Sequence, residues 1–325
     1  MTVEMSALMS TPARPWIRRA VVLALLSSWP WASGAQDVEL AVAVAFTEGP
    51  TVDREGNVYF TELVASRILK LTPDGVLSTF REASNFANGL LIDLEGRLVA
   101  AEGAESRRTG VLITGRPRVT RTDLGTGRIE IVADNYEGKP FSGPNDLTID
   151  AKGRLYFTDL TGAAVYRIDA PGKVARILAA PDVQRPNGIQ ISPDETTLYL
   201  VESNSAEGGA RMIRAYDLLP DGTVRNMRVH YNFHPGRSAD GMSIDIKGNL
   251  YAAAGLQRRR GTSETLDTKC GVYVISPAGR LLKFIPVPED TITNTAFGGP
   301  DMKTLYVTAG KTLYKVRTDM AGLAR

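Results

Sequence analysis

The stretch Asp150-Ala-Lys-Gly-Arg-Leu-Tyr-Phe157 carries the pattern that decides the fold. It combines a turn that opens with Asp and closes with Gly with a run of Leu, Tyr and Phe that is typical of a β-strand. Related segments recur along the chain, and the six copies begin at Asp53, Asp93, Asp150, Asp194, Asp245 and Asp301. Such an internal repeat indicates an array of similar supersecondary units.

The spacing of the six copies predicts a β-propeller. Successive copies begin 40, 57, 44, 51 and 56 residues apart, close to the roughly 40 to 50 residues of a propeller blade. Further strand-like segments lie between the copies, which brings each unit to about four strands. We therefore expect an all-β fold, a six-bladed β-propeller with four-stranded blades around a central channel, formed by residues 36–325 as a single domain.

The Asp that opens each turn has a structural explanation. Its side chain can accept hydrogen bonds from the backbone of its own turn, and the Gly that follows three residues later in four copies tolerates a positive φ. We interpret Asp53, Asp93, Asp150 and Asp245 as turn residues rather than as functional residues.

Residues 1–35 have the layout of a signal peptide. Three arginines precede an apolar run over residues 20–31, and small residues follow at Ser33, Gly34 and Ala35. The apolar run is shorter than the roughly 20 residues of a membrane-spanning helix. We expect cleavage after Ala35 and an exported protein, periplasmic or secreted, without a membrane anchor.

Charge and cysteine content exclude some classes of function. The chain holds 38 basic and 36 acidic residues; the leader contributes three Arg and one Glu, so residues 36–325 hold 35 of each and are formally neutral. A basic face for nucleic acid is therefore not expected. Cys270 is the only cysteine, so an intramolecular disulfide cannot form. We expect surface or packing roles for His230 and His234, and a solvated loop at Arg258-Arg-Arg260.

An oxygen-bearing side chain precedes the turn Asp in every copy. It lies five residues before the Asp in four copies and seven residues before it in the copies at Asp194 and Asp301. Equivalent positions in a propeller are related by rotation about the central axis, so we expect these residues to form a ring at the mouth of the channel. The six residues are Glu48, Asn88, Asn145, Asn187, Asp240 and Asn294.

Converging side-chain oxygens are suited to a hard cation. Ca²⁺ takes about six to eight oxygen ligands from carboxylates, amide carbonyls and water. Glu48 and Asp240 together supply two negative charges, which match a divalent ion. The alternative is that these side chains only cap the strand starts through bonds to the backbone, which accounts less well for Glu48.

At these residues the chain resembles the senescence marker protein/regucalcin, gluconolactonase and lactonase-like family, and more distantly diisopropyl fluorophosphatase. The resemblance covers nearly all of residues 36–325, and its motifs are Phe46-Thr-Glu-Gly-Pro50, Gly143-Pro-Asn-Asp-Leu147, Tyr156-Phe-Thr-Asp159, Pro186-Asn-Gly-Ile189, Ala239-Asp-Gly-Met242 and Phe297-Gly-Gly-Pro-Asp301. It implies a catalytic divalent cation held by Glu48, Asn187 and Asp240, with Asn145 as a further ligand or a substrate contact. We expect Ca²⁺, with Zn²⁺, Mn²⁺ and Mg²⁺ as alternatives.

The same resemblance implies hydrolysis of sugar lactones. A cation that polarises the carbonyl still needs a base for the attacking water, and Asp240 is our candidate, with Glu48 second. The expected substrate contacts are Asn145, Asn88, Arg107 and Arg108; the two arginines could bind an anionic group at the pocket rim, and a solvated loop is the alternative for them. Two alternatives stay open: a phosphotriesterase-like hydrolase, and a non-catalytic propeller whose ion stabilises a binding module.

The chain departs from the family pattern at two places. Many gluconolactonases carry Cys-Glu-His after the second repeat, where this chain has Ala101-Glu-Gly103, and a frequent Thr-Asp-Pro-Pro segment is replaced by Thr158-Asp-Leu-Thr161. We expect the second change to alter a loop that borders the pocket.

Overall fold

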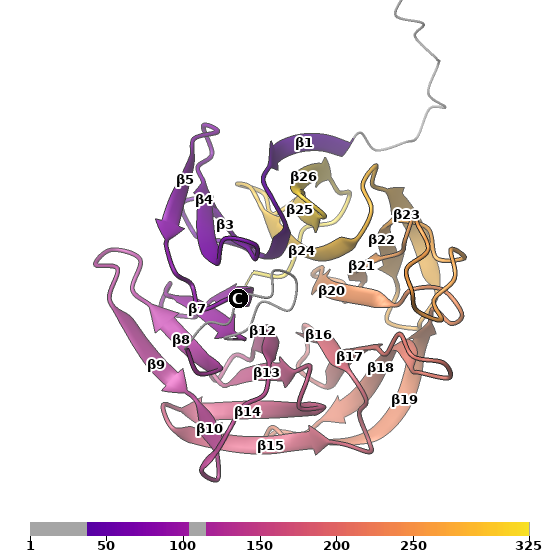
Figure 1. The fold of residues 1–325 in the computed structure, drawn as a ribbon, viewed down its shortest axis with the longest axis horizontal. Coiled ribbons are helices and arrows are strands. Elements are labelled where there is room, and N and C mark those ends of the chain that lie inside the picture. Colours follow the sequence, from indigo (N-terminus) through magenta and orange to yellow (C-terminus); the bar gives the residue numbers. More distant parts are fainter. Residues whose placement is uncertain (1–37, 104–114, 325) are drawn as a thin grey trace, which may run out of the picture. The chain divides into compact units, whose positions relative to one another are not determined.

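The computed structural model describes residues 38–103 and 115–324, which form 26 strands and no helix. Six four-stranded sheets follow one another around a central channel (Figure 1). This arrangement confirms the predicted six-bladed β-propeller. The predicted signal peptide, residues 1–35, and the predicted contacts Arg107 and Arg108 lie outside the described residues. Within the described part of the chain, no helix has the length and hydrophobicity to cross a membrane.

The blades are numbered along the chain, and the strands of each blade follow in order from the innermost to the outermost. Blade 1 contains β2 (Thr47–Val52), β3 (Val58–Glu62), β4 (Arg67–Leu71) and β5 (Leu77–Arg81), and blade 2 contains β6 (Ala87–Ile92), β7 (Leu98–Glu102), β8 (Arg118–Thr122) and β9 (Ile129–Ala133). Blade 3 contains β12 (Pro144–Ile149), β13 (Leu155–Asp159), β14 (Ala164–Ala170) and β15 (Lys173–Ala179), and blade 4 contains β16 (Pro186–Ile191), β17 (Thr197–Ser203), β18 (Arg211–Leu218) and β19 (Val224–Asn232). Blade 5 contains β20 (Ala239–Ile244), β21 (Leu250–Ala254), β22 (Gly271–Ile275) and β23 (Leu281–Pro286), and blade 6 contains β24 (Ile292–Gly298), β25 (Thr304–Ala309), β26 (Thr312–Arg317) and β1 (Val38–Ala43). A two-stranded hairpin, β10 (Asn135–Tyr136) with β11 (Lys139–Pro140), precedes blade 3.

Blade 6 joins the two ends of the described chain. Its outermost strand, β1, comes from the N-terminal side and pairs antiparallel with β26 near the C-terminus. This pairing closes the ring of blades, so the first and last blades hold each other through backbone hydrogen bonds.

The turn aspartates have the structural role that the sequence predicts. In blade 3, Asp150 Oδ1 accepts the backbone N–H groups of Lys152 and Arg154, each at 3.0 Å, and its Oδ2 accepts the Arg154 guanidinium at 2.6 Å. Gly153 closes this turn with φ +79°. Asp53, Asp93 and Asp245 accept the N–H four residues later in the same way.

The hydrophobic core lies between neighbouring blades. One cluster brings Val99 and Val119 of blade 2 against Leu147 and Phe157 of blade 3. Similar clusters fill the other blade interfaces, and Cys270 is buried in the cluster shared by blades 5 and 6. Because apolar packing holds the blade faces together, the inner strands are fixed around the channel and can present side chains at defined places.

Candidate active site

The innermost strands bring the predicted ring residues to one end of the channel. Strands β2, β6, β12, β16, β20 and β24 each begin a blade, and each contacts the innermost strands of both neighbouring blades. In five blades the predicted residue follows directly after the first paired residue of the strand, as Glu48 follows Thr47 and Asn187 follows Pro186. The rotational equivalence expected from the sequence therefore holds for Glu48, Asn88, Asn145, Asn187 and Asp240.

The sixth ring position was predicted wrongly. In β6 the pairing passes from Ala87–Glu102 to Leu90–Ala100, with a bulge at Asn88. In β24 the pairing passes from Ile292–Ala309 to Thr295–Val307. Thr293 is therefore the residue of β24 that corresponds to Asn88 of β6. The Thr293 hydroxyl is fully buried and lies 2.8 Å from the Thr308 hydroxyl and 3.0 Å from the Thr47 carbonyl. Blade 6 thus contributes a hydrogen-bonded hydroxyl and no ligand.

Asn294 belongs to the next layer, which divides the channel. The residues after the ring position are Gly49, Gly89, Asp146, Gly188, Gly241 and Asn294. The glycines leave space that the two larger side chains fill, since a Cβ at Gly241 would stand 2.0 Å from Asn294 Cγ and one at Gly89 would stand 2.8 Å from Asp146 Oδ1. Asn294 Nδ2 donates to Asp146 Oδ1 at 3.4 Å, and burial raises the pKa of the Asp146 carboxyl to about 7.

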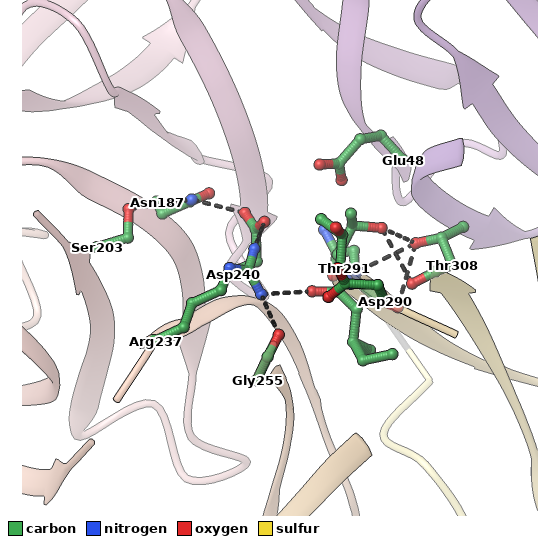
Figure 2. A network of polar contacts seen from close by, with 12 residues as sticks. Glu48, Asn187, Ser203, Arg237, Asp240, Gly255, Asp290, Thr291 and Thr308 are labelled. Carbon is green, nitrogen blue, oxygen red and sulfur yellow. Dashed lines mark hydrogen bonds and ion pairs between the residues drawn. The ribbon is translucent and has the colours of Figure 1, made fainter. Parts of the chain in front are cut away.

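Above this layer lies a pocket of about 350 Å³ that all five remaining ring residues line. Figure 2 shows the Glu48 carboxylate pointing toward the space that Asp240 and Asn187 face from the other side. Glu48 and Asn187 are buried, and Asp240 is half-buried. Four side chains predicted as cation ligands, Glu48, Asn145, Asn187 and Asp240, therefore meet at the mouth of one channel.

Asp240 is held by two neighbours. Its Oδ1 accepts Asn187 Nδ2 at 2.6 Å, and its Oδ2 forms an ion pair with the Arg237 guanidinium. Arg237 is buried and also donates to the backbone carbonyl of Ile292 at 2.9 Å. Sequence reasoning missed Arg237, because no other repeat has an arginine at this position. The ion pair cancels one of the two negative charges that the sequence suggests for the ring.

Buried carboxylates at the ends of the second strands hold the loops around the pocket. They are Glu62, Glu102, Asp159 and Glu202, all at most 1% exposed. Asp159 accepts the backbone N–H groups of Ser142, Gly143 and Gly162 at 2.7–2.8 Å. Glu202 accepts the N–H of Arg185 at 2.8 Å, and burial raises its pKa. The Tyr156-Phe-Thr-Asp159 motif, with a carboxylate at the same strand position in blades 1, 2 and 4, is the sequence signal for this group.

The pocket walls differ between blades. Blades 1 to 3 contribute Phe46, Leu63, Phe86, Pro144 and Leu160, together with Asn88 and Thr161. Leu160 and Thr161 belong to the segment expected to alter a pocket loop, and both line the pocket. Blades 4 and 5 contribute Arg185, Arg260 and Glu264. Arg258, Arg259 and Arg260 are exposed, as predicted for a solvated loop, and Arg260 also lines the pocket. His230, on β19, packs against Tyr199, and His234 is exposed. Neither histidine lines the pocket.

Comparison with known proteins places these features in a family. The family model described as SMP-30/Gluconolactonase/LRE-like region matches residues 46–311. The chain belongs to this family. A gluconolactonase of Zymomonas mobilis is 30% identical over 321 residues, which cover 87% of this chain and 81% of that protein. The solved structure of a gluconolactonase from Xanthomonas campestris is 26% identical with a TM-score of 0.72, and covers 87% of this chain and 90% of its own. A calcium-binding regucalcin from Agrobacterium tumefaciens shares the fold, with a TM-score of 0.68 at 20% identity over 90% of this chain and 98% of its own.

The side chains of this family member fit a hard cation. Across residues 38–103 and 115–324, no group of three or more His, Cys, Asp or Glu gathers around one point, so a soft-metal site of thiolates and imidazoles is absent from that part of the chain. The four predicted ligands instead offer two carboxylates and two amides, a set suited to oxygen-preferring ions. Asn187 Nδ2 donates to Asp240 and to Ser203 Oγ, at 2.6 and 3.2 Å, so Oδ1 is the atom of this side chain that could ligate a cation.

Proposed function

We propose that this protein is a divalent-cation-dependent hydrolase of sugar lactones and that Ca²⁺ is its working ion. The observation that carries the proposal is the meeting of Glu48, Asn145, Asn187 and Asp240 at the mouth of one channel, in a chain whose family includes a gluconolactonase 30% identical to it. Hard oxygen donors without sulfur or imidazole suit Ca²⁺, Mg²⁺ and Mn²⁺, and the choice of Ca²⁺ among them is supported by the calcium-binding regucalcin of the same fold.

The bound cation would polarise the lactone carbonyl and stabilise the negative charge that develops on its oxygen. The residues of the chain would activate the attacking water and position it. Asp240 is the candidate base for the attacking water, and its contacts with Arg237 and Asn187 fix the carboxylate in one orientation. Glu48 faces it from blade 1 as the second carboxylate.

Substrate orientation would come from the uncharged wall. Asn88 and Asn145 offer amide groups for ring hydroxyls or the carbonyl, while Phe46, Phe86 and Leu160 supply apolar surface for the faces of a sugar ring. The layer formed by Asp146 and Asn294 closes the pocket from below, so substrate and water would enter from the mouth only. We further propose that residues 1–35 direct export, so that the enzyme acts outside the cytoplasm.

The test combines metal analysis with kinetics. Wild-type protein purified with Ca²⁺ should hydrolyse glucono-δ-lactone, lose activity in excess chelator and regain it when Ca²⁺ is restored. Asp240→Ala should lower metal content and reduce kcat/KM at least about 100-fold, whereas Asp301→Ala removes an exposed turn carboxylate remote from the pocket and should change neither. Full metal content and full activity in Asp240→Ala would overturn the proposal. Turnover of a phosphotriester but of no lactone would overturn the substrate class.

A further inference from the structure

The charged residues of the pocket are concentrated on blades 4 and 5. Apart from Glu48, every charged residue among the described lining residues comes from this side: Arg185, Arg237, Asp240, Arg260 and Glu264. Arg237 and Asp240 form an ion pair and neutralise each other. Two arginines and one glutamate, Arg185, Arg260 and Glu264, are left on this wall.

Arg185 is presented to the pocket by a fixed backbone. Its N–H donates to the buried Glu202 carboxylate at 2.8 Å, and its carbonyl accepts the Ser203 N–H at 3.0 Å. Asn187, a candidate cation ligand, follows two residues later on β16. Within the described residues the Arg185 guanidinium forms no hydrogen bond and no ion pair, although it is only partly exposed.

Arg260 is exposed, and one hydrogen bond orients its side chain. Its guanidinium donates to the Thr291 hydroxyl, which precedes β24 of blade 6. The loop that carries it is anchored by Arg211, a side chain 1% exposed that donates to the carbonyls of Ala206 and Pro235 at 2.8 Å and of Ser263 at 3.3 Å. A charged side chain buried for such contacts indicates that this wall has a defined shape.

Glu264 forms no ion pair with either arginine. It is buried, accepts the Thr262 hydroxyl at 2.9 Å and forms no ion pair with any residue in the described part of the chain. The described lining residues comprise three carboxylates and three arginines, whose charges sum to zero. A divalent cation would raise the charge of this described lining to plus two.

We propose that the substrate lactone carries a second, anionic group, a carboxylate, phosphate or sulfonate, which Arg185 and Arg260 bind while the lactone carbonyl faces the ring of Glu48, Asn187 and Asp240. This inference rests on the proposed function and adds the substrate class. The guanidinium fork matches the oxygens of such anions and binds them more strongly than it binds neutral hydroxyls. An anionic substituent, together with the carboxylate that hydrolysis creates, balances the positive charge of the loaded pocket.

The experiment compares lactones that differ only in this group. Glucono-δ-lactone is the neutral member; its phosphate ester at the primary hydroxyl is one anionic member, and glucarolactone, paired with the neutral glucono-γ-lactone, is the other. Wild type should show a kcat/KM at least ~10-fold higher for an anionic member than for its neutral partner. Arg185→Gln and Arg260→Gln should each remove most of this preference through KM and change the neutral substrates less than ~2-fold. Arg258→Gln, an exposed arginine of the same loop, is the control and should alter nothing.

The outcomes separate this inference from the proposed function. A wild-type preference for the neutral lactones, or an equal loss on both members of a pair in Arg185→Gln, overturns the anion site while leaving lactone hydrolysis intact. If no lactone is hydrolysed, calorimetric binding of glucarate and gluconate to the Ca²⁺-loaded protein decides the matter. Tighter binding of the dianion that disappears in Arg185→Gln supports the site, and equal binding of the two acids overturns it.

Discussion

The two ends of the central channel are built from the same six strands and carry different side chains. At the mouth, the strand starts surround a pocket of about 350 Å³ lined by Glu48, Asn187 and Asp240. At the base, the other halves of the strands surround a pocket of about 420 Å³. It is lined by aliphatic side chains such as Ile149 and Ile244, by hydroxyls, and by Asp53, Arg54 and Asp146. The larger cavity is therefore at the end without a charged ring, which shows that cavity size alone does not locate the site.

The polar groups at the base bind one another. Thr148 Oγ1 donates to Gln190 at 3.4 Å, and Gln190 Nε2 donates to the Met242 carbonyl at 3.2 Å. The hydroxyls of Ser243 and Thr295 lie 2.8 Å apart. These contacts link neighbouring blades and consume the hydrogen-bonding capacity of the base, so its polarity is explained by structure.

At the mouth, polar groups are directed at the space instead. At the equivalent ring position, blades 1 and 5 present the carboxylates Glu48 and Asp240, whereas blades 2 to 4 present asparagines, and loops held by buried carboxylates surround them. The repeat thus makes a uniform scaffold, and function is placed where the repeats differ. Matched changes at the two ends of the channel should therefore have unequal effects on activity.

The largest effect on kcat/KM is expected from replacing the Glu48 carboxylate at the mouth by an amide. Glu48→Gln keeps the size of the side chain and removes its charge, so metal affinity should fall and kcat/KM for lactone hydrolysis should drop roughly 100- to 1000-fold, about 3 to 4 kcal/mol. Thr148→Val makes a similar exchange at the base and should change kcat/KM less than ~2-fold. Steady-state kinetics with metal analysis test this pair. Equal losses in both variants would remove the distinction between the two ends.

The next largest effect is expected on stability and KM, and it distinguishes two buried aspartates of blade 3. Asp159 holds mouth loops through three backbone N–H groups, and Asp150 holds the turn at the other end. Asp159→Ala and Asp150→Ala should each lower the free energy of unfolding by roughly 2 to 3 kcal/mol, because each leaves buried donors without an acceptor. Only Asp159→Ala should also raise KM, since Ser142 and Leu160 line the pocket. Urea unfolding and kinetics per folded molecule distinguish the two, and a raised KM in Asp150→Ala would contradict the assignment of ends.

The fold was predictable because the repeated turn is chemically self-contained. An Asp that accepts the N–H four residues later and a Gly at φ near +80° define the hairpin locally in four repeats. The constant distance from this turn to the start of the inner strand then placed Glu48 and Asp240 correctly. Asn294 was misplaced because the register shift between Ile292 and Asn294 decides which residue takes the ring position, and this register depends on the partner strand β25.

The charged wall was not predictable from the repeat. Arg185, Arg237, Arg260 and Glu264 have no counterparts in the other repeats, and only the loops of blades 4 and 5 bring them together. The anchoring role of Arg211 likewise depends on carbonyls from segments 24 to 52 residues away. The buried carboxylates at the ends of the second strands were partly predictable. Their repetition is visible in the sequence, but their contacts are not.

The smallest effect concerns His230, which lies on the outer strand β19 and lines neither pocket. Burial, and to a lesser degree the nearby Arg228, lower the pKa of His230 to about 4. The folded state then keeps this imidazole neutral while the unfolded chain binds a proton below about pH 6.5, so the free energy of unfolding should decrease as the pH falls from about 6.5 to 4. Partial contact with solvent limits this contribution to about 2 kcal/mol. His230→Phe retains a ring against Tyr199 and should flatten the decrease, measured by urea unfolding at several pH values, with unchanged kcat/KM at pH 7. An identical pH dependence in both proteins would assign the acid sensitivity to other groups, and a change in kcat/KM would show that the outer strands influence the mouth.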